Sequence, residues 1–185
     1  MKLWLPRQTG FCHGVKAAVD KALSLTGNAY CLGEIVHNES VVKSLAEKGI
    51  VTVRSVSEVP DGATMLIRAH GEPPETYAEA KRRNITVVDA TCPSVKAIQQ
   101  KAAKYHAEGY IIVLVGNASH PEIKGINGWC DGKAIVTDGM SPVTLPACEK
   151  ALVMFQTTFD TRFFEKSLQN ISTDSVKTLE IFNTI

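Results

Sequence analysis

Apolar and polar positions follow one another along the chain in a pattern typical of helices separated by short strands. Val15, Ala18, Val19 and Ala22 recur at the i, i+3, i+4, i+7 spacing of an amphipathic helix. Asn38 is a good capping residue and predicts a second helix that runs to Lys48, where Gly49 is a stop signal. The same reasoning predicts helices over 74–83, from 95 through 102 and near 160–169.

Short runs rich in β-branched residues lie between these helices. They predict strands at residues 50–53, 65–69, 85–89, 110–115, 134–137, 151–156 and 178–183. The run at 110–115 is continuously apolar, as in a parallel strand that is buried on both faces. Strands that alternate with helices predict an α/β fold with mostly parallel sheets.

Composition narrows the class of protein. With 185 residues and 44% hydrophobic residues, the chain can bury a core of its own without a disulfide scaffold. Its 20 basic and 19 acidic residues leave a net charge of +1, which argues against nucleic acid or an anionic membrane as a general partner. We find no signal peptide and no apolar run of transmembrane length, so we expect a cytoplasmic protein.

The cysteines are odd in number and widely spaced: Cys12, Cys31, Cys92, Cys130 and Cys148. Without a secretion signal, disulfides are the less favoured use of these thiols, and the absence of CxxC argues against a zinc ribbon or a thioredoxin-type site. Any metal site must therefore combine distant segments.

An internal repeat contains the residues of chemical interest. The segment Cys-x-x-Val-Lys-Ala begins at Cys12 and again at Cys92, and Gly-x-x-x-His ends at His37 and again at His120. A third match aligns the strand ending at His70 with the strand ending at Thr157. We interpret the chain as two similar α/β domains, residues 1–92 and 93–185.

The repeat also predicts a continuation. Residues 87–91 lead into Cys92, and residues 181–185 occupy the matching place in the second unit, where the next residue would be a cysteine. On this interpretation the chain is two-thirds of a pseudo-threefold, trefoil-like assembly. A third domain with a third cysteine is absent from it.

Candidate chemistry follows from the repeat. Six residues each come just after an apolar or strand-like run: Cys12, His37, His70, Cys92, His120 and Thr157. Ligands of parallel α/β units collect at the carboxyl ends of strands. Related units would direct these side chains to a common centre, with thiolates suited to a metal and imidazoles and hydroxyls suited to an anion.

Several short motifs together resemble one enzyme family. In order they are Gly10-Phe-Cys-His-Gly-Val15, Ile35-Val-His-Asn38, Arg68-Ala-His-Gly71, Asp89-Ala-Thr-Cys-Pro93, His120-Pro-Glu122 and Gln156-Thr-Thr158. The set resembles 4-hydroxy-3-methylbut-2-enyl diphosphate reductase, the LytB/IspH family, over the whole chain. The resemblance implies an iron–sulfur oxidoreductase of isoprenoid biosynthesis that dehydroxylates its allylic diphosphate substrate to isopentenyl and dimethylallyl diphosphate.

The resemblance also assigns roles. It implies a [4Fe–4S] cluster on three cysteines, two of them Cys12 and Cys92, with one iron open for the substrate alcohol. Because the third cysteine would lie in the absent unit, we expect this truncated chain to be inactive alone, with little or no intact cluster. Electrons would come singly from reduced ferredoxin or flavodoxin. Glu122 would deliver protons. The diphosphate contacts would be His37, His70, His120, Thr157 and Thr158.

Each assignment has a structural alternative. A lone cysteine is usually a buried thiol, which we expect for Cys31, Cys130 and Cys148. We also expect ordinary roles for His13, His106 and Glu39, a solvated face for the basic run 81–83, and packing roles for Trp4 and Trp129. Two other functions stay open at this point: a diphosphate-binding module without a metal, and a zinc-dependent hydrolase.

Overall fold

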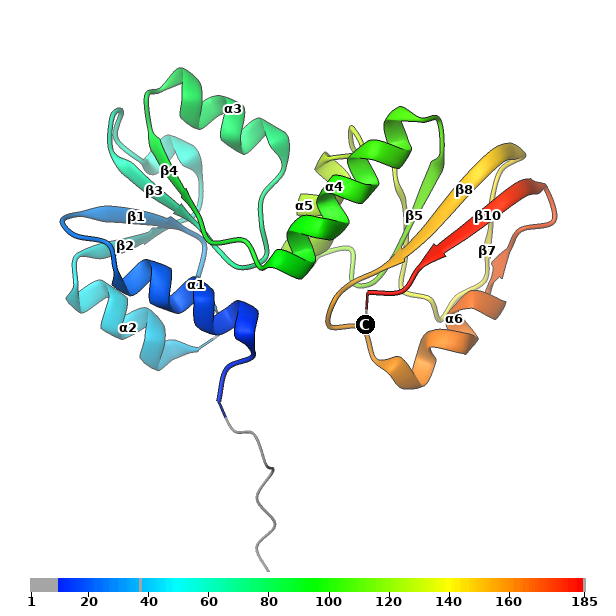
Figure 1. Ribbon diagram of the computed structural model, residues 1–185, viewed down its shortest axis with the longest axis horizontal. Helices are drawn as coiled ribbons and strands as arrows, with labels where there is room; N and C mark the ends of the chain where they lie inside the picture. The colour runs from blue at the N-terminus through cyan, green and yellow to red at the C-terminus, as the bar shows by residue number, and fades with distance from the viewer. Residues whose placement is uncertain (1–9, 37, 185) are drawn as a thin grey trace, which may run out of the picture.

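The computed structural model describes residues 10–36 and 38–184. Two parallel four-stranded sheets form two lobes, with α4 and α5 between them (Figure 1). In the first lobe the elements run α1 (His13–Leu23), β1 (Ala29–Leu32), α2 (Glu39–Glu47), β2 (Ile50–Val53), β3 (Thr64–Ile67), α3 (Pro74–Arg82) and β4 (Thr86–Asp89). The predicted α/β class with parallel sheets is confirmed.

The second lobe repeats this order. Its elements are α4 (Pro93–Ala107), β5 (Ile111–Val115), α5 (Pro121–Gly128), β6 (Ile135–Thr137), β8 (Cys148–Phe155), α6 (Phe164–Gln169) and β10 (Val176–Phe182). A small sheet of β7 (Val143–Thr144) and β9 (Ile171–Ser172) is added at its side. The sheet orders β2-β1-β3-β4 and β6-β5-β8-β10 are the same, so the sequence repeat corresponds to a repeated topology.

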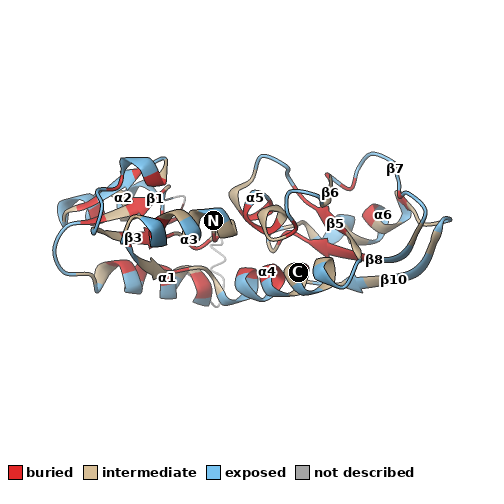
Figure 2. Ribbon diagram, turned by 90° about the horizontal axis from the view of Figure 1, so that it is seen from above, coloured by how far each residue is buried: buried red, intermediate tan, exposed pale blue. Residues whose placement is uncertain are grey.

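Each sheet is covered by helices on both faces. In the first lobe α1 and α2 bury one face, while α3 and the 3-10 turn Val56–Glu58 bury the other. In the second lobe α4 and α5 cover one face, and α6 covers the other together with the β7–β9 sheet. Figure 2 shows the buried residues on the strands and on the helix faces that look toward them. Within the described residues no helix is long and apolar enough to cross a membrane.

The pairing register corrects one of our sequence matches. Leu32 pairs with Ile67 in the first sheet, and Val115 pairs with Phe155 in the second. Ile67 and Phe155 also lie on the same face of their sheets, in the clusters that contain α3 and α6. His70 therefore matches Thr158, and its match to Thr157 was wrong by one residue. Because side chains alternate along a strand, a slip of one residue puts every side chain on the opposite face.

The local signals for helix ends are mostly confirmed. The side chain of Asn38 caps α2 by accepting a hydrogen bond from the Val41 N–H at 3.2 Å. Gly49 follows α2 with φ +85°, a conformation that favours glycine. The strand β1 was missing from our predictions because its four residues follow no alternation that separates them from a helix end.

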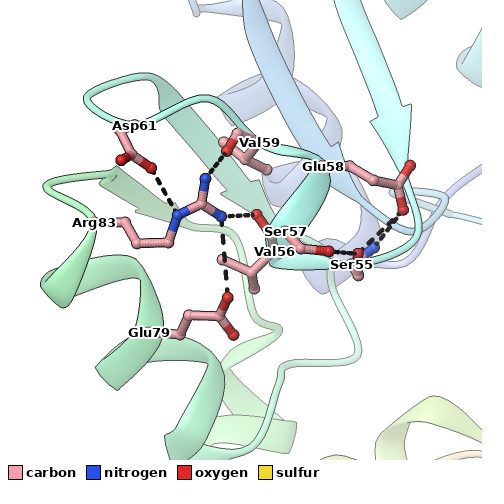
Figure 3. A network of polar contacts seen from close by, with 8 residues as sticks. All are labelled: Ser55, Val56, Ser57, Glu58, Val59, Asp61, Glu79 and Arg83. Atoms are coloured by element: carbon pink, nitrogen blue, oxygen red, sulfur yellow. Dashed lines mark hydrogen bonds and ion pairs between the residues drawn. The ribbon is translucent and has the colours of Figure 1, made fainter.

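The basic run at 81–83 is a solvated face only in part. Lys81 and Arg82 are exposed, but the guanidinium of Arg83 folds back over the turn after β2 (Figure 3). Its Nη1 and Nη2 donate to the carbonyls of Val56 and Val59, both at 2.6 Å, and its Nε donates to Asp61 at 2.7 Å. Arg83 therefore ties the end of α3 to the 3-10 turn.

Candidate active site

The two candidate cluster cysteines occupy equivalent places, each immediately before a helix. Cys12 is the N-cap of α1 and Cys92 is the N-cap of α4, with Pro93 at the first helical position. The two ends meet at Gly14, where an added Cβ would lie 2.4 Å from the Cys92 Sγ. Glycine thus makes room for the Cys92 thiol two residues after Cys12.

The other cysteines lie elsewhere. Cys31 on β1 and Cys130 after α5 are buried, and burial raises their pKa values to about 12 and about 11. Cys148 begins β8 and is half-buried. In the described ranges, no group of three or more His, Cys, Asp and Glu side chains is arranged to hold a metal ion.

The N-terminus of α5 positions the candidate acid. His120 caps this helix, and its Nδ1 accepts a hydrogen bond from the Glu122 N–H at 3.2 Å. In a neutral imidazole an accepting Nδ1 leaves the proton on Nε2, so His120 presents a donor on its other edge. Asn117 shapes the preceding loop, since its Oδ1 accepts from both the N–H and the hydroxyl of Ser119.

The Glu122 carboxyl is buried and accepts hydrogen bonds from the residue that follows β8, the strand paired with β5. Thr157, just after β8, donates its N–H to Oε1 and its hydroxyl to Oε2, both at 2.7 Å. Only 1% of Glu122 is exposed. Burial raises the pKa of Glu122, and the two hydrogen bonds from Thr157 oppose that shift. The matching Glu39 is exposed at the start of α2, as expected for an ordinary first-turn acid.

Residues from both lobes meet at this site. His70, which follows β3, has its ring in edge-on contact with the ring of His120, with centroids 5.1 Å apart. His37 lies outside the described residues, as does Trp4. His13 is exposed and His106 lies 3.4 Å from Asp131, so neither joins this group. Trp129 packs as expected, with its indole N–H donating to the Glu72 carbonyl at 3.1 Å.

The side chains of Thr157 and Thr158 contact different groups at the end of β8. Thr158 accepts a hydrogen bond from the Gln156 Nε2 at 2.7 Å and lines a cavity of about 580 Å³ at the ends of β5, β6 and β8. His120, Glu122 and Thr157 do not line that cavity. The structure therefore joins Thr157 to the His120–Glu122 group and places Thr158 beside Gln156.

Gln156 is a site residue for which our sequence reasoning predicted no role. Its Oε1 accepts from the Asn117 N–H at 3.0 Å, and its side chain lies over Gly116, where an added Cβ would be 2.7 Å from that oxygen. Gln156 thereby links the loop that leads to His120 with the segment that holds Thr157. The equivalent pair in the first lobe is Arg68 over Gly33. A signal existed in the repeat, because both glycines directly follow the first strand of their unit.

The fold agrees with comparisons to known proteins. The family model described as LytB protein matches residues 3–185. The chain belongs to the LytB family. A relative from Alkaliphilus oremlandii, named 4-hydroxy-3-methylbut-2-enyl diphosphate reductase, is 37% identical over 191 residues, covering all of this chain and 68% of the relative. Relatives of the same name from Clostridium acetobutylicum and Prosthecochloris aestuarii are 38% and 40% identical, and the chain covers 30% and 56% of their lengths.

Solved structures of reductases with similar names also match. A structure of (E)-4-hydroxy-3-methyl-but-2-enyl diphosphate reductase superposes with a TM-score of 0.77 at 36% identity, covering 95% of this chain and 65% of that one. The reductase from Plasmodium falciparum gives a TM-score of 0.84 at 25% identity, covering 93% and 57%. This LytB chain thus spans about two thirds or less of these proteins. Their reductase names do not favour the metal-free binding module or the zinc hydrolase.

Proposed function

We propose that this LytB-family chain binds 4-hydroxy-3-methylbut-2-enyl diphosphate and takes part in its reduction to isopentenyl and dimethylallyl diphosphate. The observation that carries the proposal is the buried Glu122 carboxyl, held by both donors of Thr157 at a helix start capped by His120. The reductase names of the relatives support the same reaction.

The diphosphate would be bound by imidazole and hydroxyl donors. His120 offers its Nε2–H, since its Nδ1 accepts from the Glu122 N–H. His70 lies against it from the other lobe, so two rings from separate sheets line one place. The N-terminus of α5 adds the positive end of a helix dipole, which favours an anion. We assign His37, Thr157 and Thr158 to the same substrate by the resemblance of their motifs alone, because the Thr157 hydroxyl donates its proton to Glu122 and Thr158 lies beside Gln156.

Glu122 is the proposed acid. Replacement of the hydroxyl by hydrogen consumes two electrons and two protons and releases water. Because burial raises the pKa of Glu122, its carboxyl holds a proton more readily than an exposed one. Thr157 keeps the carboxyl in one orientation, so that the proton is presented in a fixed direction. Glu122 would give this proton to the departing oxygen.

Cys12 and Cys92 fit as two ligands of an iron–sulfur cluster. Both thiols stand at helix N-termini, and Gly14 leaves space at the Cys92 sulfur. When bound, a [4Fe–4S] cluster would supply single electrons and an iron with an open position. Residues 10–36 and 38–184 place no third metal-binding side chain beside these two cysteines. Reduced ferredoxin or flavodoxin is the proposed electron source.

We also propose that the chain consists of two similar α/β domains. We place the division between the two α/β domains at Cys92 and Pro93, where β4 of one sheet leads into the first helix of the other. The pairing register supports the match of residues 181–184 to 87–90, because Leu66 pairs with Val88 and its counterpart Met154 pairs with Phe182. A third unit of the same kind would complete the pseudo-threefold arrangement.

This function is tested by an anaerobic assay of the whole protein that the gene encodes. We expect iron, acid-labile sulfide and turnover of the allylic diphosphate with a one-electron donor. Cys12→Ser and Cys92→Ser should each lose iron and turnover together, whereas Cys148→Ser, the matched control at a half-buried thiol, should keep both. Turnover that persists in Cys12→Ser and Cys92→Ser without bound iron would refute the proposal.

A further inference from the structure

Asp89 ends β4, in the short segment that leads into α4, and lies three residues before Cys92 (Figure 1). Its Oδ1 accepts two hydrogen bonds from Thr91, from the N–H at 3.0 Å and from the hydroxyl at 2.5 Å. Its Oδ2 accepts from the Nζ of Lys96, near the start of α4, at 2.8 Å. The carboxylate is therefore bonded on both sides of the Cys92 thiol, to the residue before it and to the helix after it.

The backbone of Asp89 contacts the other helix that begins at a candidate ligand. Its carbonyl accepts a hydrogen bond from the Nζ of Lys21, in the last turn of α1, at 2.7 Å. Lys21 and Gly14 are seven residues apart, so they lie on one face of α1. Gly14 lies against the Cys92 sulfur at the other end of that face. Asp89 therefore bonds both to α1, which Cys12 precedes, and to α4, which Cys92 precedes.

The environment of Asp89 keeps its carboxyl ionised. Only 23% of the side chain is exposed. Burial raises the pKa of Asp89, but the hydrogen bonds from Lys96 and Thr91 together outweigh burial and hold the pKa below its ordinary value. An ionised carboxylate only accepts hydrogen bonds, which is what its three donors require.

The sequence repeat offers a comparison for Lys96. Lys16 has the same place in the first Cys-x-x-Val-Lys-Ala segment. It pairs with Asp20, four residues further along its own helix, and both side chains are exposed. Exposed ion pairs within a helix contribute little to stability. Lys96 instead leaves its helix and bonds to Asp89 on the far side of Cys92, so the two lysines occupy one repeat position with different contacts.

We propose that Asp89 is a positioning residue for the two candidate cluster ligands, Cys12 and Cys92. Its carboxylate fixes the turn before Cys92 to the start of α4, and its carbonyl fixes α1 beside that turn. Groups that orient metal ligands without touching the metal typically contribute about 10–100-fold to metal affinity. The inference rests on the proposed function, because it concerns the residues that would hold the iron–sulfur cluster.

This role is tested by iron release from the whole protein that the gene encodes, after anaerobic reconstitution. With excess chelator, Asp89→Ala should lose iron at least about tenfold faster than the parent. The electron paramagnetic resonance spectrum of its reduced cluster should also differ, because the Cys92 sulfur is displaced. Asp89→Asn keeps an oxygen for Thr91 but cannot accept from Lys96, so its rate should lie between those two. Lys96→Met should match Asp89→Asn, and the control Lys16→Met should match the parent.

The outcomes separate this role from the proposed function. A parent without iron and sulfide would refute the proposed function and the role of Asp89 with it. A parent that holds iron, with equal release rates and spectra in Asp89→Ala and Lys16→Met, would overturn the positioning role alone. A lower urea midpoint of Asp89→Ala, with the rate and spectrum of the parent, would also overturn it, since Asp89 would then serve folding only. Should Asp89→Ala not fold, Asp89→Asn decides, and the parent's release rate in that variant would overturn the role.

Discussion

Thr157 donates its backbone N–H and its hydroxyl to the two carboxylate oxygens of Glu122, 35 positions away in the chain. One residue thus fixes the position and the rotation of a buried carboxyl. The two hydrogen bonds favour the ionised form and burial favours the neutral form, and burial is the larger effect. The Glu122 carboxyl therefore has a fixed orientation and a raised pKa.

Glu122→Gln should keep iron and diphosphate binding but lose turnover by ~10²–10⁴-fold, the usual contribution of a general acid. The amide keeps the size of the side chain but cannot deliver the proton. Glu39→Gln is the matched control, because Glu39 has the same place at the start of α2 and is exposed. Turnover of Glu122→Gln within a few-fold of the parent would remove Glu122 from the chemistry.

The pH dependence of stability should reveal the raised pKa of Glu122. A group whose pKa is higher in the folded state contributes stability below its unfolded pKa and loses that contribution as pH rises through its folded pKa. The ordinary pKa of a glutamate carboxyl is 4.5. The stability of the parent minus that of Glu122→Gln should therefore fall as pH rises above about 4.5, and then level off. Urea unfolding of both chains at several pH values measures this difference, and a difference that grows with pH would contradict the assignment.

Ala substitutions at His70 or His120 should weaken binding of the diphosphate while iron content stays near that of the parent. Each charge-assisted hydrogen bond contributes about 1.5–3 kcal/mol, or roughly one to two decades in affinity. Titration with inorganic pyrophosphate and iron analysis measure the two quantities separately. His13→Ala, at an exposed histidine beside Cys12, is the control. Lost iron with unchanged affinity would show that the imidazoles are metal ligands.

Much of this fold could be predicted because local signals and the repeat agree. The caps, the strand runs and the Cys-x-x-Val-Lys-Ala match all mark the same two units, and the structure repeats the sheet order. The register of the third match could not be fixed from sequence, since the strands before His70 and Thr158 are apolar on both faces. Without an alternating pattern, a slip of one residue leaves no trace in the sequence.

Contacts between distant segments could not be predicted either. The bonds from Thr157 to Glu122 join the segment after β8 to the first turn of α5, and the two approach only when β5 pairs with β8. The spacing of Val95, Ile98, Gln99 and Ala102 places Gln99 on the buried face of α4, but its approach to Gly71 in the other lobe could not be predicted. Arg83 is likewise indistinguishable from Arg82 until the 3-10 turn presents its carbonyls.

Arg83→Met should destabilise the first lobe. The guanidinium satisfies two loop carbonyls and Asp61, and its side chain is 25% exposed. Hydrogen bonds to charged groups contribute about 1.5–3 kcal/mol, and we expect a loss near the lower end because the site is partly open to water. Arg83→Lys should recover little, because an ammonium lacks the planar fork. Urea unfolding compares both variants with the exposed control Arg82→Met, and equal midpoints for Arg82→Met and Arg83→Met would contradict the role of the network.

Thiol accessibility should separate the cysteines without any assay of activity. Cys12 is exposed, whereas Cys31 and Cys130 are buried and have pKa values raised to about 12 and about 11. Since the thiolate is the reactive form, iodoacetamide should modify Cys12 first and reach Cys31 and Cys130 only on unfolding. Mass spectrometry of timed samples, with and without denaturant, measures the order. Early modification of Cys31 in the folded chain would show that the first sheet opens readily.

Gly14→Ala tests the space reserved for the Cys92 sulfur. An added Cβ would lie 2.4 Å from Sγ and 3.3 Å from the Cβ of Cys92, so the thiol must rotate to another position. Alanine also favours the helix by about 1 kcal/mol, which offsets part of the crowding, and stability should change little. The iron and sulfide content should nevertheless fall well below that of the parent. It is measured after anaerobic reconstitution of the whole protein that the gene encodes. Ala17→Ser, at an exposed position on the same helix, should retain both. Full iron content in Gly14→Ala would show that the cluster does not need Cys92 in this orientation, and the pairing of Cys12 with Cys92 as ligands would then lose its structural support.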